Sequence, residues 1–170
     1  LVGDICRSIY DNGFKRMVII NGHGGNSAPN HVVRDTVSEE NIFPVAYSWW
    51  QSVSEEMLAW SEADNGSVGH GGEWETSVML HLREYLISKG HMNDDIFPNP
   101  FSPELQHFAG FSERRRDTRD ITGTMGSSSA ASKEKGEQIF NLAVERLEKL
   151  AREFHAIPPR EYREFGSHCL

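Results

Sequence analysis

Residues 16–26, Arg16-Met17-Val18-Ile19-Ile20-Asn21-Gly22-His23-Gly24-Gly25-Asn26, decide the fold class. The run over 16–20 is short, apolar and rich in β-branched residues, and it ends abruptly in glycines, so it predicts a buried strand that leads into a tight loop. A helix beginning near Ser27 and a second strand over 42–47 are expected to follow. Strand, helix and strand at this spacing predict a βαβ unit of a parallel sheet, and therefore an α/β fold.

Composition limits what the chain can bind. It has 170 residues, 17 basic and 25 acidic side chains and a net charge of −8, which argues against a nucleic-acid partner. No apolar run approaches the length of a membrane span, so we expect no membrane partner and a soluble, cytoplasmic protein. Cys6 and Cys169 lie at opposite ends and are expected to be reduced thiols.

Further elements can be placed by periodicity. Residues 2–12 have helical spacing from the first residue onward, so we expect that sequence preceding Leu1 is missing. The pattern Ser52-x-x-Glu55 predicts a capping box at the start of a short helix. A helix from Glu73 is expected to run to about residue 89, and a long one to cover 132–155. We expect a partial domain over 1–157 and a tail over 158–170.

The helix from Glu73 is expected to run through four apolar side chains: Val78, Met79, Leu82 and Leu86.

His23 is the first candidate for chemistry, because it follows a strand and is flanked by glycines. Ligands of open α/β sheets bind at the carboxyl ends of strands, and Gly24 and Gly25 leave room there for an ion or substrate. The alternative is a histidine in a turn that the glycines merely make tight. Nucleotide binding is disfavoured, because Ser27 stands where a third glycine belongs and no P-loop lysine follows.

A second glycine-rich loop adds His70, Glu73 and Glu75. The two carboxylates diverge by about 200° around a helix axis, so only one can readily share a pocket with His70. Glu75 could instead cap the helix or orient a ligand, and both could be ordinary acids of a first helical turn. A Ser-His-Asp triad from Asp64, Ser67 and His70 is weak, because the nucleophile elbow is absent.

Together, the motifs Asn21-Gly22-His23-Gly24-Gly25-Asn26 and His70-Gly71-Gly72-Glu73-Trp74-Glu75-Thr76-Ser77 resemble the creatininase (creatinine amidohydrolase) family. The late stretch Gly123-Thr124-Met125-Gly126, followed by Ala131-Ser132-Lys133-Glu134-Lys135-Gly136, is similar to that family's C-terminal glycine loop and helix start.

This resemblance implies a three-layer α/β/α domain with a mainly parallel sheet, incomplete at its N-terminus, in a homo-oligomer. It implies hydrolysis of a cyclic amide or other non-peptide C–N amide bond in a small molecule by a hydroxide held by two divalent metal ions, zinc, manganese or iron. His23 and Glu73 would be metal ligands and His70 the acid/base residue. Other candidates are residues that could orient a ligand (Asn21, Asn26, Glu75) and residues that could line the substrate pocket (Trp49, Trp50, Trp74).

Two departures from the family pattern keep a second hypothesis open. Gly25 stands where creatininase has a ligating glutamate, which is why Glu73 is taken as its substitute. Nothing before His23 matches the family's early Glu-x-His segment and aspartate. The alternative is therefore a non-catalytic fragment or assembly subunit that keeps the fold without a complete metal site.

Overall fold

The computed structural model describes residues 1–26, 43–63, 70–95, 123–124 and 126–158. The chain divides into two compact units. The first contains Leu1–Ser52 and Ala143–Leu170, and the second contains Val53–Leu142. The predicted helix near Ser27, the possible triad members Asp64 and Ser67, and Cys169 lie outside the described residues.

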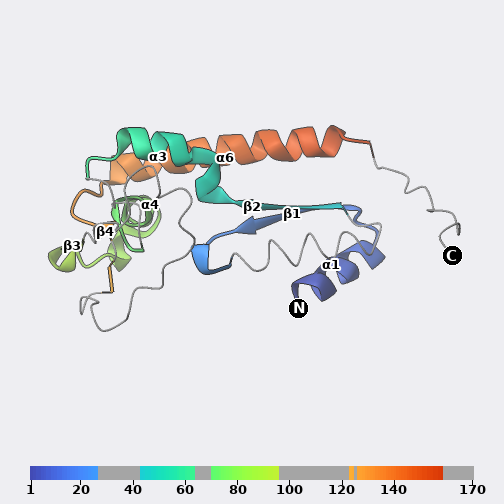
Figure 1. Cartoon of the computed structure of the whole chain (residues 1–170), viewed down its shortest axis with the longest axis horizontal. Coiled ribbons are helices and arrows are strands. Elements are labelled where there is room, and N and C mark those ends of the chain that lie inside the picture. Colours follow the sequence, from blue (N-terminus) through green and yellow to red (C-terminus); the bar gives the residue numbers. More distant parts are fainter. Residues whose placement is uncertain (27–42, 64–69, 96–122, 125, 159–170) are drawn as a thin grey trace, which may run out of the picture. The chain divides into compact units, whose positions relative to one another are not determined.

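Two parallel strands organise the first unit (Figure 1). Helix α1 (Val2–Asp11) is followed by β1 (Arg16–Asn21), and β1 pairs in parallel with β2 (Phe43–Ser48). The register runs from Arg16 opposite Phe43 to Asn21 opposite Ser48. This pairing confirms the predicted parallel arrangement, and it brings the last residues of both strands to one edge of the sheet.

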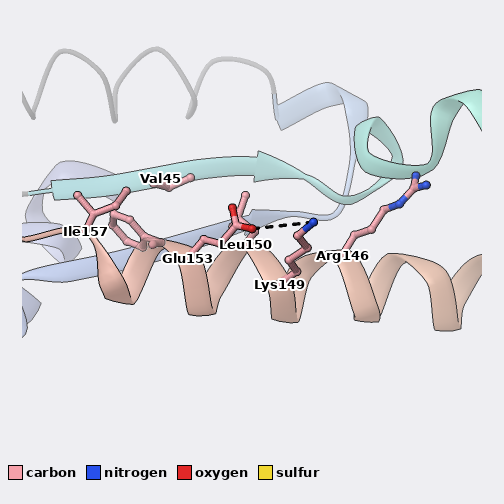
Figure 2. A pocket seen from close by; sticks show the side chains of 7 residues that line it. Val45, Arg146, Lys149, Leu150, Glu153 and Ile157 are labelled. Carbon is pink, nitrogen blue, oxygen red and sulfur yellow. Dashed lines mark ion pairs between the residues drawn. The ribbon is translucent and has the colours of Figure 1, made fainter.

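The first unit is packed on both sides of its strands. Cys6 of α1 and Met17 of β1 are buried together, which places a free thiol in the core. Helix α6 (Lys133–Ala156) belongs to this unit from Ala143 onward. Figure 2 shows Val45 of β2 near the last turns of α6, at a cavity of about 360 Å³. The Arg16 guanidinium donates a hydrogen bond to the Ile157 carbonyl at 2.6 Å, which ties the end of α6 to the start of β1.

The second unit is built mainly from helices. It contains α3 (Ser54–Trp60), α4 (Glu73–Arg83) and the first ten residues of α6. Short 3₁₀ turns cover Glu84–Leu86 and Lys89–His91, and the two-residue strands β3 (Asp94–Asp95) and β4 (Gly126–Ser127) pair antiparallel.

The predicted capping box is wrong. The residue that precedes α3 is Val53, which makes no side-chain cap. Ser52 instead donates its hydroxyl to the Trp49 carbonyl at 2.7 Å, because residues Trp49–Val53 already form a 3₁₀ turn that uses this hydroxyl. The local sequence pattern therefore serves the turn rather than the helix.

The predicted length of α4 is also wrong, and of the apolar residues expected along it only Val78 and Met79 are half-buried. The helix ends at Arg83, and Leu86 lies in the following 3₁₀ turn with 59% of its surface exposed. The buried face carries Trp74 and Leu80 together with Glu73 and Ser77, whose polar groups are satisfied inside the protein. Because hydrogen bonds satisfy their polar groups, Glu73 and Ser77 can be buried where hydrophobicity alone would predict apolar residues.

Helix α6 confirms the prediction for 132–155 within one residue at each end. Its apolar side chains Ile139 and Phe154 are buried. Among the helices that the structure describes, none has the length and apolar character needed to cross a membrane.

Candidate functional site

Side chains join the carboxyl ends of β1 and β2. The Asn21 amide donates to the Ser48 hydroxyl at 3.1 Å, and the Asn21 side-chain oxygen accepts a bond from the His23 amide at 3.1 Å. Asn21 and Ser48 are both buried. Because both strand ends are fixed, the glycine loop that carries His23 starts from a defined position.

His23 lies exposed on this loop, and its ring folds back over the next turn. Its Nδ1 accepts a hydrogen bond from the Gly25 amide at 3.0 Å, and its carbonyl accepts one from the Asn26 amide at 3.0 Å. With Nδ1 as the acceptor, the proton of the neutral ring lies on Nε2. A β-carbon at Gly25 would lie 3.0 Å from Nδ1, which is a tight contact. The imidazole ring can occupy this position because Gly25 has no side chain.

Trp49 and Trp50 follow β2 directly and lie half-buried. Their rings meet edge to face, with centroids 6.2 Å apart and planes at 89°. Since Asn21 is in register with Ser48, the tryptophans and His23 continue from the same edge of the sheet. Ligands of parallel sheets bind at this kind of edge.

The second loop is held by hydrogen bonds to the first turn of α4. His70 is exposed and is followed by Gly71, whose φ of 62° favours glycine. The Gly71 amide donates to the Glu75 carboxylate at 2.8 Å, and the Thr76 hydroxyl donates to the Gly71 carbonyl at 3.0 Å. Glu75 thus accepts from the amide of Gly71, one residue before the N-cap Gly72, which itself has no side-chain cap.

Glu73 has no exposed surface, and protein donors surround its carboxylate. The Ser61 hydroxyl donates to Oε2 at 2.5 Å, and the Glu62 amide and the Lys135 ammonium donate to Oε1 at 3.1 and 2.7 Å. Burial raises the pKa of Glu73, but the bonds from Lys135, Ser61 and Glu62 outweigh it and leave the pKa below its ordinary value. Glu73 is therefore a buried anion with a protein counter-ion.

Trp74, the third predicted pocket residue, is 2% exposed, and its buried indole N–H has no hydrogen-bond acceptor among the residues that the structure describes. It packs within the second unit, whereas Trp49 and Trp50 belong to the first.

Lys135 is the residue that the sequence reasoning passed over, although it lies in the Glu-Lys-Gly stretch over 134–136. A signal was available in its neighbour, since a glycine inside a helical pattern often marks close packing. A β-carbon on Gly136 would overlap the Ser77 carbonyl group of α4.

The described residues do not by themselves form a metal centre. Within the part of the chain that the structure describes, no three His, Cys, Asp or Glu side chains gather closely enough to hold an ion. His23 is exposed, and its imidazole is a ligand that suits zinc or iron, but the Gly25 amide must release Nδ1 before either ring nitrogen can bind an ion. Glu73 does not fit in the observed arrangement, because Lys135 and Glu62 already occupy Oε1. His23 lies in the first unit and Glu73, His70 and Glu75 in the second.

Comparison with known proteins identifies the class of protein. The family model described as creatinine amidohydrolase matches residues 1–151. The chain therefore belongs to the creatininase family. Its relative in Pseudomonas putida, named creatinine amidohydrolase, is 29% identical over 163 residues, which cover 89% of this chain and 60% of the relative.

Solved structures agree with this assignment. A candidate creatinine amidohydrolase from Bacteroides fragilis matches with a TM-score of 0.75 at 30% identity, over 93% of this chain and 61% of the other. A manganese creatininase matches with a TM-score of 0.68 at 28% identity, over 89% and 61%. The chain thus has an α/β creatininase-like fold and spans about three fifths of the length of these relatives.

Proposed function

We propose that this chain is part of a metal-dependent amidohydrolase that opens a cyclic amide or another non-peptide C–N amide bond in a small molecule. Membership of the creatininase family supports an amidohydrolase. Two similar structures are described as a manganese creatininase and a Zn-Zn type mutant creatininase. A third structure is a mutant creatininase complexed with creatine. The observation that carries the proposal is the position of His23, which follows β1 at the carboxyl edge of the parallel strands.

The proposed roles divide between the two histidines. His23 would supply an imidazole nitrogen to one of two divalent ions, zinc, manganese or iron. Such ions polarise a carbonyl and make water acidic enough to react near neutral pH. His70 would hold the proton that the leaving nitrogen takes up, because imidazole titrates near neutrality.

Neighbouring residues would set the positions of these two rings. Asn21 fixes the start of the His23 loop through Ser48, and Asn26 closes the turn after it. Glu75 holds the amide next to His70. Trp49 and Trp50 offer half-buried aromatic surface that suits a small planar ring.

The metal-binding role of His23 can be tested on the protein at its full natural length. We expect His23→Ala to lower the metal content per chain, and we expect His91→Ala, which alters an exposed histidine, to leave it unchanged. His70→Ala should keep the metal and lose turnover on a panel of cyclic amides and N-formyl compounds. Full metal occupancy in the His23 variant would contradict the ligand assignment.

A second candidate is a non-catalytic chain or assembly subunit that keeps the fold. It is favoured by the finding that the described residues contain no cluster of three metal-binding side chains. The two candidates differ in metal content, since only the enzyme should bind two ions per chain. Assembly as a homo-oligomer and a cytoplasmic location stay predictions under either candidate.

A further inference from the structure

The Glu73–Lys135 pair joins three segments of the second unit. Glu73 is the first residue of α4, and Lys135 lies in the first turn of α6. The Lys135 ammonium lies 2.7 Å from Oε1 of Glu73, and the remaining donors to Glu73 come from residues 61–62, directly after α3. One buried carboxylate therefore connects the end of α3 with the starts of α4 and α6.

The bonding of Lys135 is complete. An ammonium group has three hydrogens, and the structure offers three acceptors: Glu73 at 2.7 Å, the Ala130 carbonyl at 2.9 Å and the Glu62 carboxylate at 3.1 Å. The lysine side chain is only 15% exposed. The positive charge of Lys135 is therefore balanced by the carboxylates of Glu73 and Glu62 in the observed arrangement.

A metal ion at Glu73 would disturb this arrangement at high cost. The ion would bring further positive charge to a carboxylate oxygen that already accepts the ammonium. Displacing Lys135 would instead leave an ammonium group in a largely buried site with one of its partners removed, which is strongly unfavourable. Glu75, by contrast, is exposed.

We infer that Glu73 is not a metal ligand but a positioning residue, which Lys135 holds so that the start of α4, and with it the turn carrying His70, keeps its place. This inference rests on the proposed function for the acid/base role of His70. It also explains the neighbouring contacts, since Ser77 donates to the Glu73 carbonyl at 2.6 Å and accepts from the Ser132 amide at 3.1 Å. The first of these bonds lies within α4, and the second ties α4 to Ser132, the residue before α6.

The test uses the protein at its full natural length. It measures Glu73→Gln, Lys135→Met and the variant that combines these two substitutions, and it compares all three with the control Lys133→Met. Lys133 is the matched control, because it lies two residues away on the same helix and is 55% exposed. We expect both single variants to lower the melting temperature by several degrees and to leave the metal affinity within about twofold. The double variant should lose less than the sum of the single losses, because neither charge is then left alone.

Positioning requires a readout beyond stability. The ring resonances of His70 in ¹H–¹³C spectra should shift in Glu73→Gln and Lys135→Met. They should stay in place in Lys133→Met and in Ile139→Val, which shortens a buried side chain of the same unit and keeps both members of the pair. Unshifted His70 resonances in both pair variants would refute the positioning role.

A metal-ligand role for Glu73 predicts the opposite pattern. Glu73→Gln would then weaken metal binding at least tenfold, and Lys135→Met would strengthen it by removing a competitor. Either result would overturn the inference. If the unmodified protein binds no metal, the proposed function fails, and the stability cycle together with the His70 resonances still decides whether the pair positions α4.

Discussion

Replacing Gly136 by alanine should destabilise the protein, although helix propensity predicts the reverse. Gly136 is buried in the first turns of α6. A β-carbon there would overlap the carbonyl group of Ser77 and lie 3.0 Å from the amide of Val78. All the overlapped atoms belong to the backbone of α4, so no side-chain rotation can relieve the contact.

The magnitude follows from two opposing contributions. Alanine is favoured over glycine in a helix interior by about 1 kcal/mol. Overpacking costs about 1–3 kcal/mol, and the upper end applies here because the two helices must move apart by on the order of 1 Å. That movement would also strain the bonds from the Ser132 amide to Ser77 and from Lys135 to Glu73. We expect a net loss of about 2 kcal/mol, or roughly 4–8 °C in melting temperature.

Thermal and urea unfolding of Gly136→Ala measure this loss, and Gly90→Ala is the control. Gly90 has a negative φ, and a β-carbon there would meet nothing within 4 Å, so its substitution should be nearly neutral. If Gly136→Ala were as stable as the parent or more stable, the gain in helix propensity would equal or exceed the cost of overpacking. The close approach of α6 to α4 would then be refuted.

Three further outcomes can be measured in the same way. Bonds from Ser127 and Ser129 lower the pKa of Asp94, so its contribution to stability is complete above the ordinary pKa of about 4 and is lost as the pH falls through the lowered value. Stability measured from pH 6 to pH 3 should therefore fall less steeply in Asp94→Asn than in the parent. Glu75→Ala should cost about 1 kcal/mol in urea unfolding by removing the acceptor of the Gly71 amide, and an unchanged midpoint would argue against this hydrogen bond. Ile139→Ala should cost about 2–5 kcal/mol because the side chain is fully buried, and a smaller loss would show that the core collapses around the gap.

Local patterns predicted the elements whose stabilising contacts are local or apolar. The β-branched run at 16–20 forms β1, and the repeated apolar positions of 132–155 form α6. The parallel pairing of β1 and β2 was predictable, because the 21 residues between them are enough for the crossover connection that parallel strands need. The motif around His23 likewise predicted a loop at the end of a strand.

The same reasoning failed where polar groups are paired inside the protein. The apolar residues expected along α4 included Leu82 and Leu86, yet those side chains are 36% and 59% exposed. Glu73 and Ser77 occupy the buried face instead, because hydrogen bonds satisfy them there. A hydrophobic pattern predicts that a glutamate is exposed, because it contains no information about a distant partner that would stabilise the carboxylate inside the protein.

The choice between Glu73 and Glu75 shows where sequence information ends. Their divergence around the helix correctly implied that they face different surroundings, and the resemblance to the creatininase family favoured Glu73 as the ligand. The structure buries Glu73 against Lys135, 62 residues later in the chain, and leaves Glu75 exposed. A buried carboxylate is stable only with a partner, and the distance between these two along the chain hides that partner from any local motif. The role of Glu73 therefore has to be judged together with position 135: a lysine there makes the glutamate part of the protein's own ion pair.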